Sequence, residues 1–162
     1  MLWLRAAVFT VVVPAVVALL VPQDLRAGPA AGGWWNLGWI LVAIGALIYF
    51  RCLAGFLAAG GTPAIFFTRH ARALLGEEPQ QVVRGGLYRY SRNPMYVGVL
   101  TAIAGQGCVY RSRSILEYLV IAALCFHLVV VFLEEPHLAR LRGPEYDAYR
   151  RRVPRWLGLP RP

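Results

Sequence analysis

The residues best suited to bind a small charged molecule are gathered in one short stretch, residues 85–98, and just before it. Asn93-Pro94 predicts a turn followed by the start of a helix, because proline suits the first helical position. An apolar run begins there, and its entrance is crowded with arginines and tyrosines: Arg84, Tyr88, Arg89, Tyr90, Arg92 and Tyr96. This pattern is typical of a binding mouth at a membrane surface or, alternatively, of a basic, aromatic belt at the membrane–water interface.

Two neighbouring carboxylates, Glu134 and Glu135, follow the last long apolar run and precede a proline that is expected to end it. The C-terminal end of a helix carries a negative partial charge, so two acids there require a cation nearby. The alternatives are a bound cationic ligand and solvated acids paired with Arg92 or Arg140. Glu134 and His137 also form a Glu-x-x-His pair, but a di-iron bundle needs two such pairs, so no metal is expected.

Composition places the chain among membrane proteins. Hydrophobic residues make up 58% of its 162 residues, which predicts a single membrane domain over residues 1–162. The net charge of +9 comes from 17 arginines against eight acids, and this basic excess is concentrated in the segments between and after the apolar runs. This distribution indicates attraction to a membrane surface, not nucleic-acid binding. Cys52, Cys108 and Cys125 lie in apolar runs without a Cys-x-x-Cys pair and are expected to be small buried hydrophobes.

Four apolar runs approach or reach the length needed to cross a ~30 Å hydrocarbon layer: residues 3–21, 34–57, 94–110 and 115–133. The predicted fold is all-α and polytopic, with about four transmembrane helices and a short C-terminal interfacial helix that opens at Pro144. Residues 1–57 form an N-terminal helix pair, residues 58–93 a cytoplasmic segment, and residues 94–162 a helical hairpin with a tail. The arginine-rich segments place both termini on the cytoplasmic side.

Two of these runs leave alternatives open. In the first, Arg5 precedes an apolar core as in a cleavable signal peptide, although its length favours a transmembrane helix kinked at Pro14. The third reaches only about 25 Å, so the hairpin either crosses the membrane or stops short. Its residues Gly98, Ala102 and Gly105 share one face, which allows another helix to approach and is expected to leave room for an acceptor's chain beside the fourth helix.

The spacing of motifs in the C-terminal half carries a resemblance. The ordered set is Tyr88-x-x-x-Arg92-Asn93-Pro94-x-Tyr96-x-Gly98, then Glu134-Glu135-Pro-x-Leu138, then Gly143-x-x-Tyr146-x-x-Tyr149-x-x-x-Val153-Pro154. It resembles the isoprenylcysteine carboxyl methyltransferase and phospholipid methyltransferase group of integral membrane enzymes over residues 80–154. The first two helices match only as hydrophobic spans.

The resemblance implies S-adenosylmethionine as cofactor, bound at the cytoplasmic face by the last two helices and the tail. The family's cofactor contacts correspond to Tyr88, Arg92, Asn93, Pro94, Met95, Tyr96 and Glu134, with Asn93 where the family has His. An extended segment that lines the cofactor corresponds to Gln80, Gln81, Val82 and Val83. Carboxylates, aromatic faces and backbone donors suit a ligand that carries a sulfonium cation and an amino-acid zwitterion.

Methyl transfer is an in-line displacement, which depends on alignment more than on acid–base chemistry. A carboxylate acceptor needs no base, whereas an amine acceptor must lose a proton. Glu135 and His127 are the candidate catalytic residues for that step. Because His127 lies inside an apolar run, it is alternatively a neutral, hydrogen-bonded side chain.

The resemblance implies a lipid-like or isoprenoid-like acceptor, with membrane lipids as partners. In the prenylcysteine enzymes an Arg four residues before the cofactor-contacting Glu pairs with the substrate carboxylate, and here this position is Val130. Arg152 is the candidate substitute, or else a surface residue that binds headgroups. The interpretation is an enzyme similar to isoprenylcysteine carboxyl methyltransferase. The alternatives are a phospholipid-type N-methyltransferase, an NADPH-dependent sterol-reductase-like enzyme and a non-enzymatic membrane interaction protein.

Overall fold

Every regular element in the described part of the chain is helical. The computed structural model describes residues 11–60 and 83–161, and residues 1–10, 61–82 and 162 lie outside it. The elements in chain order are η1 (Val11–Leu20), α2 (Val21–Leu25), η2 (Gly33–Leu37), α3 (Gly38–Ala58), η3 (Gly86–Arg89), α5 (Pro94–Val109), α6 (Arg113–Val129), η4 (Val130–Glu134) and α7 (Glu135–Arg152). The predicted all-α fold is confirmed over these ranges.

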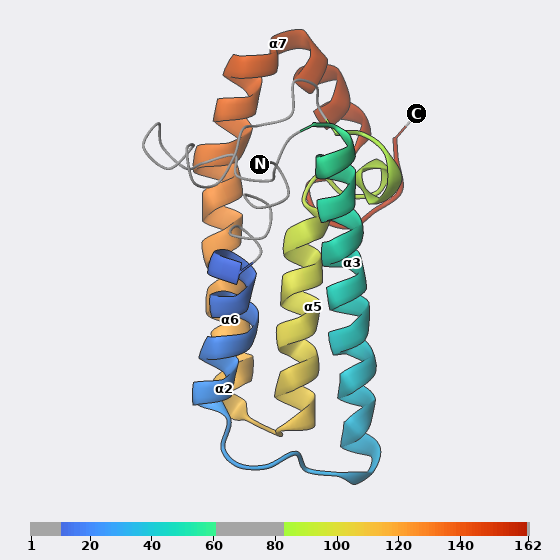
Figure 1. The fold of residues 1–162 in the computed structure, drawn as a ribbon. Coiled ribbons are helices and arrows are strands. Elements are labelled where there is room, and N and C mark those ends of the chain that lie inside the picture. Colours follow the sequence, from blue (N-terminus) through green and yellow to red (C-terminus); the bar gives the residue numbers. More distant parts are fainter. Residues whose placement is uncertain (1–10, 61–82, 162) are drawn as a thin grey trace.

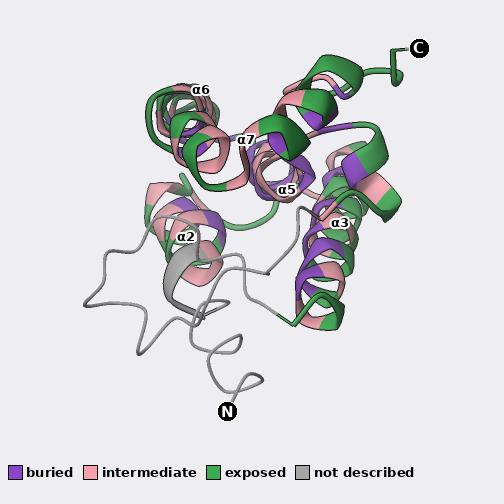
Figure 2. Cartoon of the chain, turned by 90° about the horizontal axis from the view of Figure 1, so that it is seen from above, coloured by how far each residue is buried: buried purple, intermediate pink, exposed green. Residues whose placement is uncertain are grey.

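The helices form an upright bundle with α7 folded across one end (Figure 1). Seen along the bundle axis, α5 lies between α3 and α6 (Figure 2). Val99 and Ile103 of α5 share an apolar cluster with Tyr49 of α3 and Ile115 of α6, and Ile103 and Ile115 are fully buried. The helix α5 is therefore the central element, and its first turn carries the stretch that the sequence singled out.

A seam of glycines joins α3 to α5. A Cβ added to Gly45 would lie 2.4 Å from the Gly98 carbonyl oxygen, and one added to Gly38 would lie 2.5 Å from that of Gly105. The two backbones therefore touch, which only glycine permits at this separation. The predicted approach of another helix to the small face of α5 is confirmed. The expectation that this face leaves room for an acceptor's chain is wrong, because α3 fills it.

The first predicted span lies partly outside the described residues. Its described part, η1, is π-helical and includes Pro14, where a kinked α-helix is predicted. Proline has no N–H donor, and the wider π turn is one way for a helix to accommodate the interrupted hydrogen-bond ladder. This segment is tied to the bundle by buried Gln106 of α5, whose Nε2 donates to the Ala18 carbonyl at 2.6 Å.

The last helices run on where the sequence predicts an end. The chain continues from α6 through the π-helical turn η4 into α7, with the Glu135 N–H bonded to the Val130 carbonyl. Pro136 stands in the first turn of α7, where its missing N–H is not needed. The helix bends only at Gly143, with φ 47° and ψ −125°, just before Pro144. The predicted end at Pro136 is therefore wrong, and the predicted short helix is the second half of α7.

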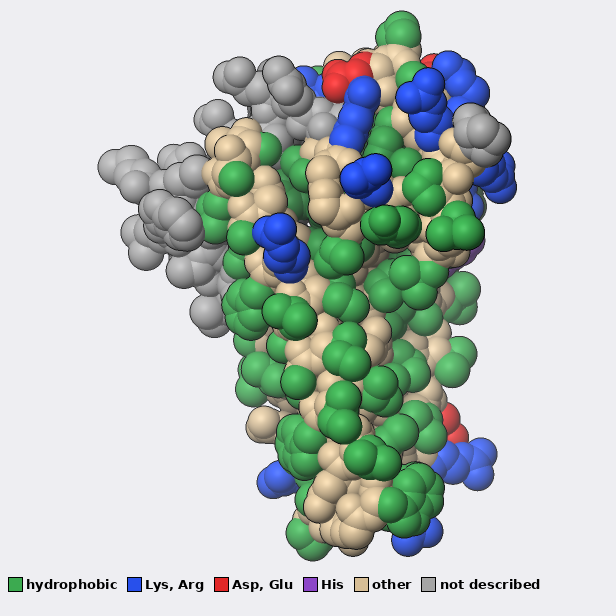
Figure 3. All heavy atoms as spheres, turned by 90° about the vertical axis from the view of Figure 1, so that its right-hand side faces the viewer, with side chains coloured by type: hydrophobic (Ala, Val, Ile, Leu, Met, Phe, Trp, Pro, Cys, Tyr) green, Lys and Arg blue, Asp and Glu red, His purple; other side chains and the backbone are tan. Residues whose placement is uncertain are grey.

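Two helices are long and apolar enough to cross a membrane, Gly33–Ala58 and the continuous Arg113–Arg152. Only 28% and 17% of the residues in their most apolar windows are buried, so these helices turn apolar side chains outward, unlike the core helix of a soluble protein. On the face shown in Figure 3, hydrophobic side chains cover the middle and arginines gather toward the two ends. The chain is thus a helical membrane protein. Pro14–Leu25 and Pro94–Val109 are shorter apolar helices, and the four-span topology stays a prediction.

Candidate active site

Two of the predicted cofactor residues, Tyr96 and Glu134, are in direct contact. Tyr96 stands in the first turn of α5, and Glu134 is the last residue of η4. The Tyr96 hydroxyl donates a hydrogen bond to Glu134 Oε1, and its ring packs against Phe126 with centroids 4.6 Å apart. Glu134 is only 6% exposed. A carboxylate this buried requires donors or cations around it, and Tyr96 supplies the first of them.

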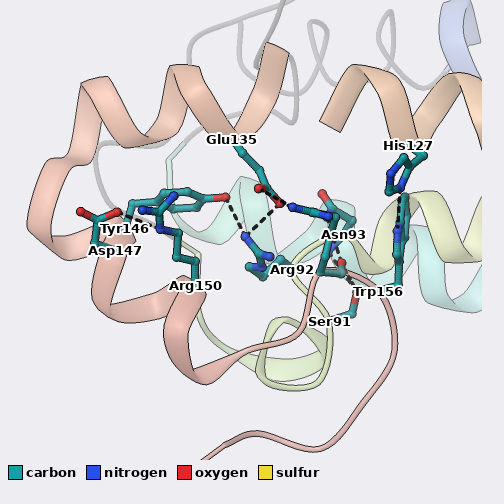
Figure 4. Close-up of polar contacts among 10 residues, drawn as sticks. Ser91, Arg92, Asn93, His127, Glu135, Tyr146, Asp147, Arg150 and Trp156 are labelled. Carbon is teal, nitrogen blue, oxygen red and sulfur yellow. Dashed lines mark hydrogen bonds and ion pairs between the residues drawn. The ribbon is translucent and has the colours of Figure 1, made fainter. Parts of the chain in front are cut away.

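The neighbouring Glu135 lies between two arginines, Arg92 and Arg155, and Figure 4 shows its contact with Arg92. Arg92 Nη1 lies 2.9 Å from Oε1, while Arg155 grips both oxygens, Nε at 2.6 Å and Nη2 at 3.0 Å. The side chains of Arg92 and Glu135 are 10% and 13% exposed, so water screens their pair weakly. The hydrogen bonds that Arg155 donates to the Glu135 carboxylate in turn raise the pKa of the Arg155 guanidinium. Of the two alternatives, the pairing of Arg92 with one of the acids is present at Glu135, but the pair is largely buried and not solvated as that alternative predicted.

The C-terminal tail packs against the residues that lead into α5. The Arg92 N–H donates to the Pro154 carbonyl at 2.9 Å, and Asn93 Nδ2 donates to the Arg155 carbonyl at 3.0 Å. The Gly158 N–H closes the contact on the Tyr90 carbonyl at 3.2 Å. Asn93, which replaces the family's His, therefore uses its amide donor to hold the tail.

Tyr88 connects this loop to α3 and α7. Its ring meets that of Phe56 edge-on at 5.6 Å, its hydroxyl is hydrogen-bonded to the Cys52 thiol, and its carbonyl accepts from the Tyr149 hydroxyl at 2.8 Å. Burial above all raises the pKa of the Tyr88 phenol, and the nearby charge of Glu134 adds to the shift. The Tyr88 phenol therefore stays neutral close to the acid.

His127 lies on α6 and is paired with the tail. Trp156 Nε1 is 3.3 Å from His127 Nδ1, and the two rings stack at 6.1 Å (Figure 4). The indole N–H can only donate, so Nδ1 is the acceptor and the neutral imidazole carries its proton on Nε2. In this arrangement the lone pair that a general base would use is already occupied.

The remaining predicted residues are placed unevenly. Met95 and Val83 pack against the buried cluster of Cys52, Phe56 and Tyr88, and Pro94 is buried at the start of α5. Arg152 is exposed at the end of α7, and no hydrogen bond or ion pair among the described residues joins its side chain to either glutamate. The predicted contacts at Gln80, Gln81 and Val82 lie outside the described residues.

Sequence reasoning missed Arg155 and Trp156. Both follow Val153-Pro154, the last piece of the motif, so the motif ended two residues too early. The signal that pointed toward them was Glu135 itself, because an acid at a helix junction needed a cation and only Arg92 and Arg140 were considered.

The donor set fits S-adenosylmethionine. Glu134 offers a buried carboxylate for a sulfonium cation, and Tyr88 and Tyr96 offer aromatic rings beside it. Arg92 Nε is buried and has no hydrogen-bond partner among the described residues, so it is a spare donor for an amino-acid carboxylate. These residues belong to the loop before α5, to α5 itself and to η4.

Comparison with known proteins agrees with this geometry. Residues 35–145 match the family described as phospholipid methyltransferase. The chain is 32% identical over 79 residues to the nickel-cobalt-cadmium resistance protein NccN of Alcaligenes xylosoxydans xylosoxydans, covering 49% of this chain and 37% of that protein. It is 36% identical over 61 residues to phosphatidylethanolamine N-methyltransferase B of Dictyostelium discoideum, covering 36% of this chain and 30% of that protein.

The matched part of the chain thus spans about a third of the length of these curated relatives. No solved structure matches the chain. The family match covers more than half of the sequence and includes α3, α5, α6 and the two glutamates. The chain therefore belongs to the phospholipid methyltransferase family.

Proposed function

We propose that this protein is an S-adenosylmethionine-dependent membrane methyltransferase whose acceptor is the amine of a phospholipid headgroup. The observation that carries the proposal is the buried Glu134, which lies beside Tyr96 at the end of helices with apolar outer faces. Family membership supports the reaction class. The name of the Dictyostelium relative, a phosphatidylethanolamine N-methyltransferase, supports an amine acceptor.

In this proposal Glu134 faces the cation of the cofactor, and the spare Nε donor of Arg92 faces its carboxylate. The bound cofactor supplies an electrophilic methyl group. Tyr88, Asn93, Pro94, Met95, Tyr96 and Val83, together with Gln80, Gln81 and Val82, complete the binding surface. The contribution of the chain is to align the reactants and exclude water, which is what a displacement at carbon requires.

The identity of residue 130 in η4 favours an amine acceptor over a carboxylate acceptor. Val130, at the position where the prenylcysteine enzymes carry an Arg, is 1% exposed and belongs to the packed interior. That position offers no cation for a substrate carboxylate. The exposed Arg152 is left as a residue that meets lipid headgroups.

A headgroup ammonium must lose a proton before it attacks. The contacts of Glu135 with Arg92 and Arg155 support a positioning role for this acid, and the occupied Nδ1 of His127 supports the same for the imidazole. We therefore assign neither as the base, and the proton leaves to interfacial water. The distribution of arginines supports a cytoplasmic location for the end that holds the site, and a cytoplasmic location of both termini is part of the proposal.

The test uses purified protein in lipid nanodiscs that contain phosphatidylethanolamine, with methyl-labelled S-adenosylmethionine. Label is expected in lipid and should resist alkali, since an amine product has no ester bond. Release of the label as methanol would instead indicate a carboxylate acceptor. Label confined to water-soluble products would exclude a lipid acceptor.

Calorimetry on the same sample distinguishes a methyltransferase from a reductase and from a protein that binds no cofactor. S-adenosylmethionine is expected to bind and NADPH is not. Binding of NADPH alone would indicate a sterol-reductase-like enzyme, and binding of neither ligand by folded protein would indicate a non-enzymatic interaction protein.

A further inference from the structure

A pocket of about 400 Å³ lies where the C-terminal end of α3 meets the turn that enters η3. This volume falls within the roughly 300–1,000 Å³ of small-molecule sites. Tyr88 connects the pocket to the candidate active site. Its side chain lines the pocket, and it lies close enough to Glu134 for the charge of that carboxylate to raise the Tyr88 pKa. Its walls come from two segments, with Arg51, Cys52 and Gly55 on α3 and Arg84, Gly86 and Tyr88 on the turn.

The lining is positively charged. It contains two guanidinium groups and, among the described residues, no carboxylate. Arg84 is partly engaged, because it forms a half-exposed ion pair with Glu145 at 3.0 Å. Arg51 has no ion pair with any described carboxylate. The pocket therefore suits an anionic group, with Arg51 as the cation available to bind it.

Arg51 also ends an apolar stripe on the outer face of α3. Leu47, Ile44 and Ile40 precede it by four, seven and eleven residues, so all four lie on one side of the helix. The three apolar side chains are 69%, 43% and 54% exposed. A long arginine at the end of such a stripe extends its charge toward the headgroup level. The stripe and the pocket together match a molecule with an anionic head and an apolar chain.

We propose that this pocket binds the phosphodiester of a glycerophospholipid, with Arg51 as its principal contact and an acyl chain along the stripe of α3. The inference rests on the proposed function and deepens it, because it names the substrate class by its phosphate. The part of the headgroup beyond the phosphate then reaches Tyr88 and the centre around Glu134. A prenylcysteine carries no phosphate and gains nothing from this pocket.

The first test replaces Arg51 and separates lipid from cofactor. In nanodiscs with a graded fraction of phosphatidylethanolamine, Arg51→Gln is expected to raise the KM for lipid by about tenfold, the usual loss of a charge-assisted contact. Its affinity for S-adenosylmethionine should be unchanged, and Arg51→Lys should keep most of the lipid affinity. Arg89→Gln is the matched control, because Arg89 is exposed on η3 beside the pocket without lining it.

A second variant fills the pocket without changing its charge. A Cβ added to Gly55 meets no atom within 4 Å, so Gly55→Leu should fold as well as the parent, since leucine also favours a helix more than glycine does. It is expected to weaken lipid binding to a similar extent as Arg51→Gln. Gly28→Leu, whose site is equally open and lies outside the pocket, controls for an added leucine.

Lipid binding can also be measured independently of methyl transfer, by native mass spectrometry of the lipid that the protein retains. The parent protein should retain phosphatidylcholine in preference to diacylglycerol, and Arg51→Gln should lose that preference. Displacement by inorganic phosphate at concentrations that match the lipid would show a free-anion site and overturn the proposal. So would an unchanged KM in both variants, or a loss of cofactor affinity in Arg51→Gln. If the parent methylates no lipid, the proposed function fails, while the retention experiment still decides the phosphate site.

Discussion

The arginines at the two ends of the helical bundle differ in their main partners, although Arg84 at the α7 end also lies over a ring, that of Tyr149, at 6.0 Å. At the hairpin end, between α5 and α6, arginines lie over aromatic rings: the guanidinium carbon of Arg111 is 5.1 Å from the ring centroid of Trp35, and that of Arg26 is 5.9 Å from that of Tyr110. At the α7 end, Arg92 and Arg155 converge on Glu135. The first arrangement is typical of a membrane interface, whereas the second builds a charged site with little water.

Ion pairs at the two ends differ in the same sense. Arg113 and Glu117, beside the hairpin, are 91% and 59% exposed, although their atoms approach to 2.8 Å. The Arg92–Glu135 pair is equally short and largely buried. Exposed pairs contribute little to stability, while a buried pair that loses one partner leaves an uncompensated charge. Similar contacts therefore have different consequences at the two ends, and four variants test this difference.

The largest effect is expected from Glu135→Gln. It leaves Arg92 and Arg155 without their shared anion and should lower the free energy of unfolding by about 3 kcal/mol. The measurement is unfolding in mixed detergent micelles. Glu117→Gln is the matched control and should cost less than about 0.5 kcal/mol. Equal losses in the two variants would remove the distinction between the ends.

Glu134→Gln comes next and should act on ligand binding. The amide oxygen still accepts the hydrogen bond from Tyr96, so the fold should be retained. The lost negative charge should weaken S-adenosylmethionine binding by about 2 kcal/mol. Isothermal titration of a folded variant checks this, and an unchanged dissociation constant would contradict the role given to Glu134.

A smaller effect is expected from Arg155→Lys. Lysine keeps the charge but cannot grip both oxygens of Glu135, so about 1 kcal/mol of stability should be lost. The tail should also loosen, which the fluorescence of Trp156 would report as a change absent from the same substitution in a Trp156→Phe background. Arg150→Lys, in the more exposed pair with Asp147, serves as control and should change neither quantity.

Arg111→Gln should have the smallest effect. A cation–π contact at an exposed site contributes about 0.5–1 kcal/mol. Stability should fall by no more than that, and cofactor affinity should stay as in the parent protein. A loss of cofactor binding would show that the hairpin end communicates with the α7 end, against the division described above.

Much of the site end was predictable because its signals are local. Pro94 begins α5 as its sequence predicts, and the face carrying Gly98 and Gly105 does receive another helix. That Tyr96 and Glu134 belong to one site followed only from the resemblance, since 38 residues separate them, and their direct hydrogen bond was not predicted. The sequence of α5 alone does not show which helix packs against its face with Gly98 and Gly105. Gly38 and Gly45 of α3 make this contact, but they lie in a hydrophobic run without a pattern that marks them.

The errors share one physical origin. A local analysis predicts that Pro136 ends the helix. In the structure the π turn before it bonds the Glu135 N–H to the Val130 carbonyl, and the helix continues through the proline. The tail contacts of Arg155 and Trp156 depend on the bend at Gly143, which reverses the chain toward α5. The continuation of the helix past Pro136 and the tail contacts both depend on the three-dimensional arrangement of the helices. The periodicity of the sequence carries no information about that arrangement.

The glycine seam between α3 and α5 also fixes the relative heights of residues on the two helices along the bundle axis. With the helices antiparallel, Gly45 and Gly98 lie at one level. At 1.5 Å per residue, Arg51 stands about 9 Å above that level and Tyr96 about 3 Å above it. The backbone contact prevents either helix from sliding, because a shift of one turn would drive a side chain into the opposite carbonyl. The vertical offset of about 6 Å between the backbone positions of Arg51, the proposed phosphate contact, and Tyr96, a proposed cofactor contact, is then fixed by the scaffold. It would select acceptors by the distance between their phosphate and their amine.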